Sequence, residues 1–121
     1  MAAACVTVYG TITSTPTGRR ELGPLVATSA TANSQVQRIV LQSGSNTITI
    51  PTVPAPSGVI IQLPSTNTAA TTLKGITGDT GLVIGKTGWA VIPFDPTSTP
   101  ASFDLTSAAT QTGLVTEIAF F

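Results

Sequence analysis

The chain has 121 residues, and its five lysine or arginine residues balance five acidic residues, so the formal net charge is zero. Only 8% of the residues are charged, which leaves no broad electrostatic field to attract nucleic acid or an anionic membrane, and we expect neither as a partner. No apolar run approaches the ~18 residues of a membrane span. The 23 threonines, together with valine and isoleucine, favour pleated strands, so the sequence predicts a single β-sandwich domain over residues 1–121.

The N-terminal segment predicts two strands. Apolar and hydroxyl residues alternate from Val6 to Thr13, with Gly10 as a candidate β-bulge. A loop is expected over residues 14–18, because serine, threonine, proline and glycine follow one another there. A short second strand is expected between Leu22 and Thr28.

Arg19, Arg20 and Glu21 form the only dense charge cluster. They fit either a solvated loop tip or an interface contact, since arginine is favoured in desolvated pairs. Cys5 is the single cysteine and is expected to be a small apolar residue on the first strand. The N-terminus has neither the basic stretch nor the long apolar core of a secretion signal, so we expect a protein made in the cytoplasm.

The rest of the chain predicts eight more strands, each bounded by glycine, proline or other turn residues. They span residues 36–41, 47–50, 59–63, 71–76, 82–84, 89–92, 102–106 and 114–121. No segment shows a capped 3.6-residue period, so no significant helix is expected. Short strands at this spacing are typical of an antiparallel, jelly-roll-like β-sandwich, here with about 8–10 strands.

The last predicted strand carries two phenylalanines. Leu114, Thr116, Ile118 and Phe120 share one face of it. We expect this strand to be an integral member of a sheet, with Phe120 in the core or under a neighbouring subunit. Phe120 and Phe121 are therefore candidate interface residues.

The sequence offers no recognisable catalytic machinery. There is no histidine, which removes the usual general base and the usual activator of a serine or cysteine nucleophile. Asp79-Thr80-Gly81 is the triplet of aspartic proteases, but it follows Thr77-Gly78 rather than an apolar strand, and we interpret it as a β-turn. Gly85-Lys86-Thr87 resembles the end of a phosphate-binding loop, but a strand rather than a helix is predicted after it. We expect a protein that is not an enzyme.

No metal or cofactor site is predicted. Asp79, Asp95 and Asp104 could supply oxygen ligands to calcium, but no two of them have the spacing of a ligand loop. Turn capping and solubility at strand edges are the favoured roles for these carboxylates. We expect no bound cofactor.

Trp89 is the only tryptophan, and two roles are open for it. It is either an anchor of the core or an exposed contact residue, because single aromatic residues at strand ends serve in both ways.

The segment from Thr71 to Ile84 carries a resemblance to a known class of proteins. Its Leu73-Lys74-Gly75-Ile76-Thr77-Gly78-Asp79-Thr80-Gly81 block is flanked by residues 59–64 and 103–106. Over about residues 45–121, this arrangement resembles small virion proteins of tailed bacteriophages. The resemblance implies a β-sandwich on the particle surface, as a decoration, tail or fibre-associated subunit, made in the host cytoplasm. It implies no catalytic residue.

Two functions follow as expectations. The first is a structural virion subunit that decorates or cements the capsid or belongs to the tail or fibre, and whose partners are itself, with a trimer as first guess, and capsid or tail subunits. The second is a carbohydrate- or receptor-binding module that uses Trp89 or Tyr9 as a stacking platform for a glycan. The aromatic content of 5% is low for a sugar-binding face and favours the first. Candidate interface or binding residues are Arg19, Arg20, Trp89, Phe120 and Phe121.

Overall fold

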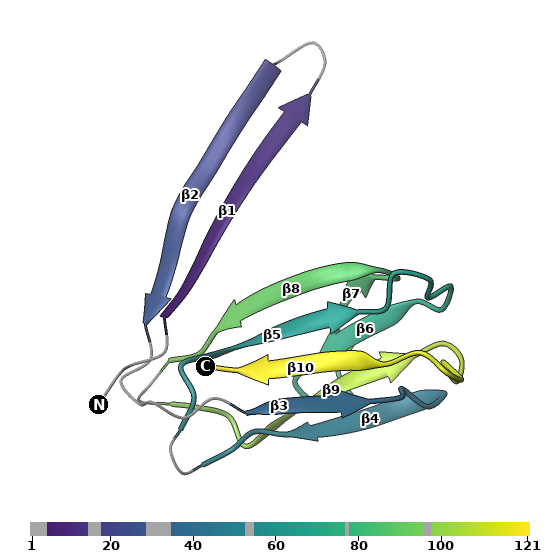
Figure 1. Ribbon diagram of the computed structural model, residues 1–121. Helices are drawn as coiled ribbons and strands as arrows, with labels where there is room; N and C mark the ends of the chain where they lie inside the picture. Colours follow the sequence, from purple (N-terminus) through teal and green to yellow (C-terminus); the bar gives the residue numbers. More distant parts are fainter. Residues whose placement is uncertain (1–4, 15–17, 29–34, 53–54, 77, 96–97) are drawn as a thin grey trace.

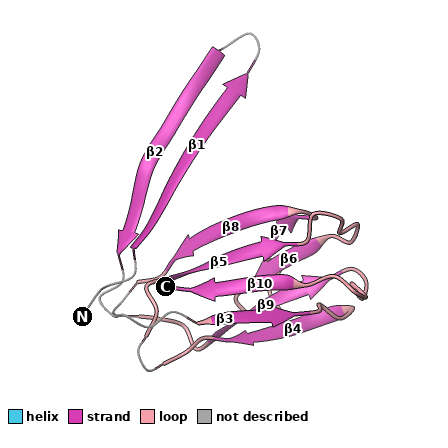
Figure 2. Cartoon of the chain, viewed as in Figure 1, coloured by secondary structure: helices cyan, strands magenta, loops and turns pink. Residues whose placement is uncertain are grey.

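A computed structural model describes residues 5–14, 18–28, 35–52, 55–76, 78–95 and 98–121. Within these residues there are ten strands and no helix (Figure 2), which confirms the predicted all-β fold. The strands are β1 Cys5–Ser14, β2 Gly18–Thr28, β3 Val36–Ile39, β4 Gly44–Thr49, β5 Gly58–Leu63, β6 Thr71–Lys74, β7 Leu82–Gly85, β8 Gly88–Pro93, β9 Ser102–Ser107 and β10 Thr116–Phe120.

Eight of the strands form two antiparallel four-stranded sheets (Figure 1). One sheet has the order β3-β10-β5-β8 and the other has the order β4-β9-β6-β7. Except for the β6–β7 hairpin, consecutive strands alternate between the sheets, and the late strands β9 and β10 insert between earlier ones. This connectivity is the double Greek key of a jelly roll, which agrees with the predicted jelly-roll-like sandwich.

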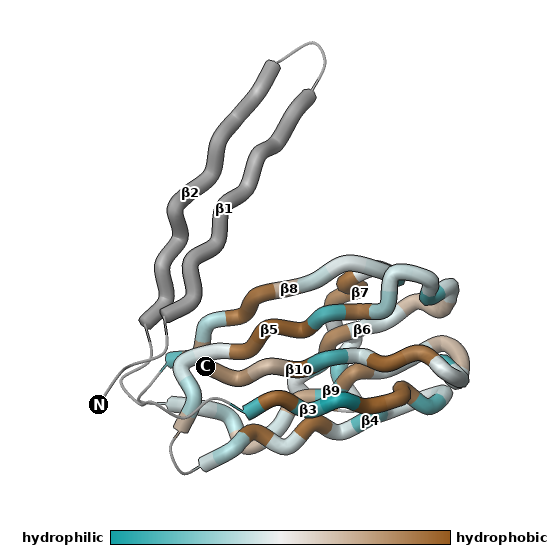
Figure 3. The backbone as a smooth tube through the Cα atoms, in the orientation of Figure 1, coloured by the Kyte–Doolittle hydropathy of each residue, from teal (hydrophilic) through white to brown (hydrophobic). Residues whose placement is uncertain are grey.

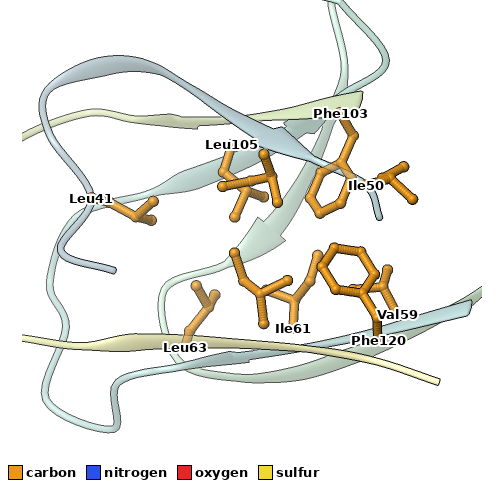
Figure 4. Close-up of a cluster of buried hydrophobic side chains, with 10 residues drawn as sticks. Leu41, Ile50, Val59, Ile61, Leu63, Phe103, Leu105 and Phe120 are labelled. Carbon is orange, nitrogen blue, oxygen red and sulfur yellow. The ribbon is translucent and has the colours of Figure 1, made fainter. Parts of the chain in front are cut away.

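The core lies between the two sheets and follows from the period-two alternation of their strands. In β5, Val59, Ile61 and Leu63 point inward, and Phe103 and Leu105 of β9 face them (Figure 4). In β4, the polar residues Ser45, Thr47 and Thr49 are exposed and alternate with Asn46 and buried Ile48, so hydropathy changes along this strand (Figure 3). The sequence thus specifies which side of each sheet is buried.

The predicted role of the last strand is confirmed. β10 lies between β3 and β5, and Thr116, Ile118 and Phe120 are buried. Phe121 continues the pairing of β10 with β5, because its N–H donates to the carbonyl of Gly58 at 3.1 Å. A Cβ at Gly58 would overlap the ring of Phe121, so glycine is needed there for a close approach. Phe120 was expected either in the core or under a neighbouring subunit, and the structure places it in the core.

β1 and β2 form a sheet of their own, which extends away from the sandwich in Figure 1. The register shifts between Val8 and Gly10, next to the predicted bulge, but the extra residue lies on β2 rather than at Gly10, because Gly23 and Pro24 stand opposite the single residue Tyr9. Opposite this shift, β2 contains Pro24, which has no N–H to donate to the partner strand. The loop-tip interpretation of residues 19–21 is wrong, since these residues belong to β2 and pair with residues 11–13 of β1. Pairing with β1 holds these three charged residues in an extended conformation.

We predict that Phe120→Ala lowers the free energy of unfolding by about 3–5 kcal/mol, because it opens a cavity between the sheets. Against a domain stability of about 5–15 kcal/mol this is a large loss. Urea denaturation followed by circular dichroism measures it. Val115→Ala, at an exposed position just before the same strand, is the control and is expected to change stability by less than about 0.5 kcal/mol. Equal effects of the two substitutions would contradict a core position for Phe120.

Candidate functional site

A row of polar and aromatic side chains crosses the outer face of the β3-β10-β5-β8 sheet. Trp89 of β8 pairs with Gln62 of β5, Gln62 pairs with Glu117 of β10, and Glu117 pairs with Arg38 of β3. Directly paired residues point to the same face. Gln62 lies between the buried residues Ile61 and Leu63, so this shared face is the solvent side. We call these four residues the outer-face row.

Trp89 is 59% exposed, so the core-anchor interpretation of this residue is wrong, and a contact role for the exposed ring stays a prediction. The physical reason is the pleat: the inward position next to it on β8 is filled by Ala90, which pairs with buried Ile61. The tryptophan ring is thereby left on the solvent side.

Glu117 is held by an ion pair, in which Nε of Arg38 donates to its Oε1 at 2.8 Å. The side chain of Arg38 is 71% exposed, so the pair contributes little to stability but limits where the carboxylate points. Among the described residues, none donates a hydrogen bond to the second carboxylate oxygen of Glu117.

A shallow depression of about 330 Å³ lies beside the row, where β5, β8 and β10 come together. Its lining is mixed: Gln62, Ser65, Thr87 and Glu117 supply polar groups, and Leu63, Pro64, Trp89 and Val115 supply apolar surface. Gly88 also lines it and has a φ of +97°, with nothing within 4 Å of the position where a Cβ would stand. The tight turn therefore leaves space next to the tryptophan.

Asn67 fixes the turn that carries Thr87 and Gly88. Its Nδ2 donates to the carbonyls of Lys86 at 2.6 Å and Ala69 at 2.9 Å, and its Oδ1 accepts from the N–H of Ala69 at 3.0 Å. Asn67 is buried. One buried amide thus joins the β5–β6 loop to the β7–β8 turn and sets the rim of the depression.

A second, chemically different surface lies at the flank of the sandwich between edge strands β7 and β8. A groove of about 370 Å³ opens there, and its lining is mainly apolar: Leu73, Leu82, Ile92, Phe94 and Phe103, with Lys74, Gly75, Asp79 and Gly81. Leu82 pairs with Leu73 and so belongs to the inner face, yet it is 66% exposed. The two sheets therefore do not close over their apolar interior at this flank.

Edge strand β7 also exposes apolar side chains on its other face. Val83 is 62% exposed, and Ile76, in the turn before β7, is 68% exposed. β7 pairs only with β6, so the N–H and C=O groups of its outer edge are not used by the described strands. We call the groove and strand β7 together the open flank.

The turn between β6 and β7 contains the aspartate of the Asp79-Thr80-Gly81 triplet. Oδ2 of Asp79 accepts the N–H of Ile76 at 3.0 Å. Gly81 has a φ of +76°, and a Cβ there would lie 2.6 Å from the carbonyl oxygen of Leu73. The predicted β-turn is confirmed. Likewise, Gly85-Lys86-Thr87 is a turn that leads into a strand.

Asp104 is buried within β9 rather than available to a calcium ion. Its carboxylate accepts hydrogen bonds from the hydroxyl of Ser45 and from the N–H of Asn46, the latter at 3.1 Å. Among the described residues, no group of three histidine, cysteine, aspartate or glutamate side chains is placed to hold a metal ion.

Of the residues predicted as interface or binding candidates, only Trp89 lies on a described surface. Phe120 and Phe121 are buried in the sandwich. Arg19 and Arg20 lie on β2, for which only the backbone is described, and the side chain of Tyr9 on β1 is likewise outside the description. Sequence reasoning missed Arg38, Gln62 and Glu117, because they meet only through long-range pairing. The signal present was weak: each is a polar residue within a predicted strand, and only Gln62 lies between two apolar residues.

Comparison of the chain with family models, with curated proteins and with solved structures gives no match. In the part of the chain that the structure describes, no helix is long and apolar enough to span a membrane.

We predict that the Arg38–Glu117 ion pair contributes little to the free energy of unfolding, whereas the buried amide of Asn67 contributes measurably. Arg38→Ala and Glu117→Gln are each expected to change the free energy of unfolding by less than about 1 kcal/mol. Asn67→Ala is expected to cost about 1–3 kcal/mol, because it removes three partly buried hydrogen bonds to the backbone of Ala69 and Lys86. Urea denaturation compares the three variants. A cost for Arg38→Ala as large as that for Asn67→Ala would show that the row is part of the scaffold.

Proposed function

We propose that this chain is a non-enzymatic structural subunit of a virion, whose task is to associate with copies of itself and with other particle proteins. In the form that fits the sequence best, it decorates or cements the capsid of a tailed bacteriophage or belongs to its tail or fibre. It then lies on the virion surface after synthesis in the host cytoplasm.

The open flank is the observation that carries this proposal. Monomeric proteins rarely expose extended apolar surface, and an uncovered edge strand is a template for pairing with another chain. Here an inner-face leucine, a groove into the core and an unpaired strand edge coincide at β7. The opposite edge of the same sheet is more polar, since β4 exposes Ser45, Thr47 and Thr49. The zero net charge leaves little repulsion between copies.

We assign the N-terminal hairpin of a second copy as the occupant of the open flank. β1 and β2, with 10 and 11 residues, pair with each other and with no other described strand. An isolated two-stranded hairpin is only marginally stable in water, so it needs a surface to pack on. Addition of a strand to an open edge provides main-chain hydrogen bonds as well as apolar contacts. The chain thus supplies both an unpartnered strand pair and an edge able to receive it.

Two observations support the virion setting. The jelly roll is an architecture that viral capsid domains use, although it also occurs in lectins and other proteins, so this support is an analogy of fold. The block from Leu73 to Gly81, which carries the resemblance to small virion proteins of tailed phages, forms the turn that leads into the open flank. Capsid or tail subunits are therefore the proposed further partners.

We predict a homo-oligomer, with a trimer as first guess, that dissociates when the open flank is made polar. Light scattering coupled to size exclusion is expected to give a multiple of the 12.2 kDa chain mass for the native protein and a shift toward that mass for Leu82→Glu. The introduced charge would have to be desolvated at the contact. Thr49→Glu, at an exposed position of edge strand β4, is the matched control and should leave the mass unchanged.

A native protein that stays monomeric at high concentration and does not sediment with purified phage particles would overturn the proposed function. If Leu82→Glu and Thr49→Glu both keep the native oligomer, the oligomer forms elsewhere and the assignment of the open flank is wrong.

A further inference from the structure

The outer-face row and its depression have a chemistry that self-association does not explain. The open flank is mainly apolar, whereas the depression combines an amide, a carboxylate and two hydroxyls with the exposed indole and the apolar residues Leu63, Pro64 and Val115. We propose that this depression binds a neutral sugar unit of a glycan, with Trp89 as the stacking platform and Gln62 and Glu117 as hydrogen-bonding residues. The proposal concerns a separate face of the molecule and goes beyond the proposed role in assembly.

The indole supplies the apolar contact that a sugar ring requires. A pyranose presents a face of C–H groups, and the negative face of an aromatic ring attracts such slightly positive hydrogens. Trp89 is 59% exposed at the rim of a depression, so one face of its ring is accessible to a ligand. Gly88 beside it has no side chain that would fill the space.

The polar neighbours supply partners for the hydroxyl groups at the ring edge. The amide of Gln62 offers donors and an acceptor, and the carboxylate of Glu117 accepts from two oxygens. Ser65 and Thr87 add hydroxyls that both donate and accept. Vicinal hydroxyls need this mixture of donors and acceptors, whereas an apolar ligand would leave the groups unpaired.

The charge of the site favours a neutral ligand. Arg38 neutralises Glu117 through the 2.8 Å ion pair, so neither sign dominates. Because Arg38 also holds the carboxylate in place, we regard it as a positioning residue. Glu117 is the only carboxylate in the lining, and the usual hydrolysis of glycosides requires two, so the arrangement points to binding rather than cleavage.

The size of the depression limits the length of glycan that it holds. About 330 Å³ is at the low end of small-ligand pockets, so we expect one or two sugar units to be in contact and dissociation constants of about 1 mM for free sugars. Oligomeric display of several copies would raise the avidity for a polymeric glycan without new contacts.

Fluorescence titration of the native protein tests the proposal, because Trp89 is the only tryptophan and reports directly on the site. The probes are glucose, galactose, mannose, rhamnose and N-acetylglucosamine as free sugars and as disaccharides, with glucuronic acid as the charged comparison. We expect a saturable emission change with at least one neutral probe and weaker binding of glucuronic acid. Saturation-transfer NMR with the same sugar provides a second readout that does not depend on the indole.

Variants separate the roles of the residues. By saturation-transfer NMR, Trp89→Ala is expected to weaken binding about tenfold or more, and Trp89→Phe to restore part of the affinity. Gln62→Ala is expected to weaken it several-fold. Val36→Ala is the matched control, since Val36 is exposed on the same face of the same sheet, one row away, and pairs with Ala119. It should bind like the native protein.

The outcomes distinguish this proposal from the proposed function. If none of the sugars gives a saturable response in either readout, the glycan site is wrong. If Trp89→Ala then also lowers the oligomeric mass, Trp89 belongs to a protein contact instead. Sugar binding by a protein that is monomeric in all tests supports the glycan site while the role in assembly fails.

Discussion

The sandwich depends on the insertion of β10 between β3 and β5. Among the described strands, β3 pairs only with β10, and the same late strand supplies Ile118 and Phe120 to the core. In the other sheet, β9 joins β4 to β6 in the same way. Most tertiary contacts therefore connect residues far apart in the sequence, and the early strands have no complete sheet until the end of the chain is in place. Such a topology is expected to fold slowly compared with helical domains of the same size.

This dependence also explains how far the sequence could be interpreted. The strand from Gly58 to Leu63 was predicted within one residue, because alternation and flanking proline are local signals. The last strand was predicted to begin at Leu114 but begins at Thr116, after the turn in which Leu114 N–H donates to the carbonyl of Gln111. Strand pairing was not predictable beyond the class, because several jelly-roll and sandwich orders satisfy the same pattern of alternation.

The candidate site shows the same limit more sharply. Trp89 could be singled out from the sequence, but whether it faced the core or solvent depended on a single-residue register, and a slip of one residue would reverse it. Gln62 and Glu117 lie 55 positions apart in the sequence and become neighbours only because β10 pairs with β5. Arg38 joins them only because β10 also pairs with β3. No local motif predicts such a row, because it forms only when β10 is inserted between β3 and β5.

The pleat of one strand keeps the two proposed surfaces apart. β8 directs Ile92 into the open flank and Trp89 to the outer face, because residues at odd and even positions of a strand point in opposite directions. Addition of a hairpin to β7 would extend the β4-β9-β6-β7 sheet, whereas the outer-face row lies on the other sheet. A subunit could therefore be covered at its apolar flank by a neighbour and still present the indole, amide and carboxylate to solvent. In the proposed assembly, the depression would stay in contact with water, and its polar groups would remain hydrated. A ligand there would compete with water for every hydrogen bond, which favours a polyhydroxylated molecule that replaces those bonds over an apolar one that does not.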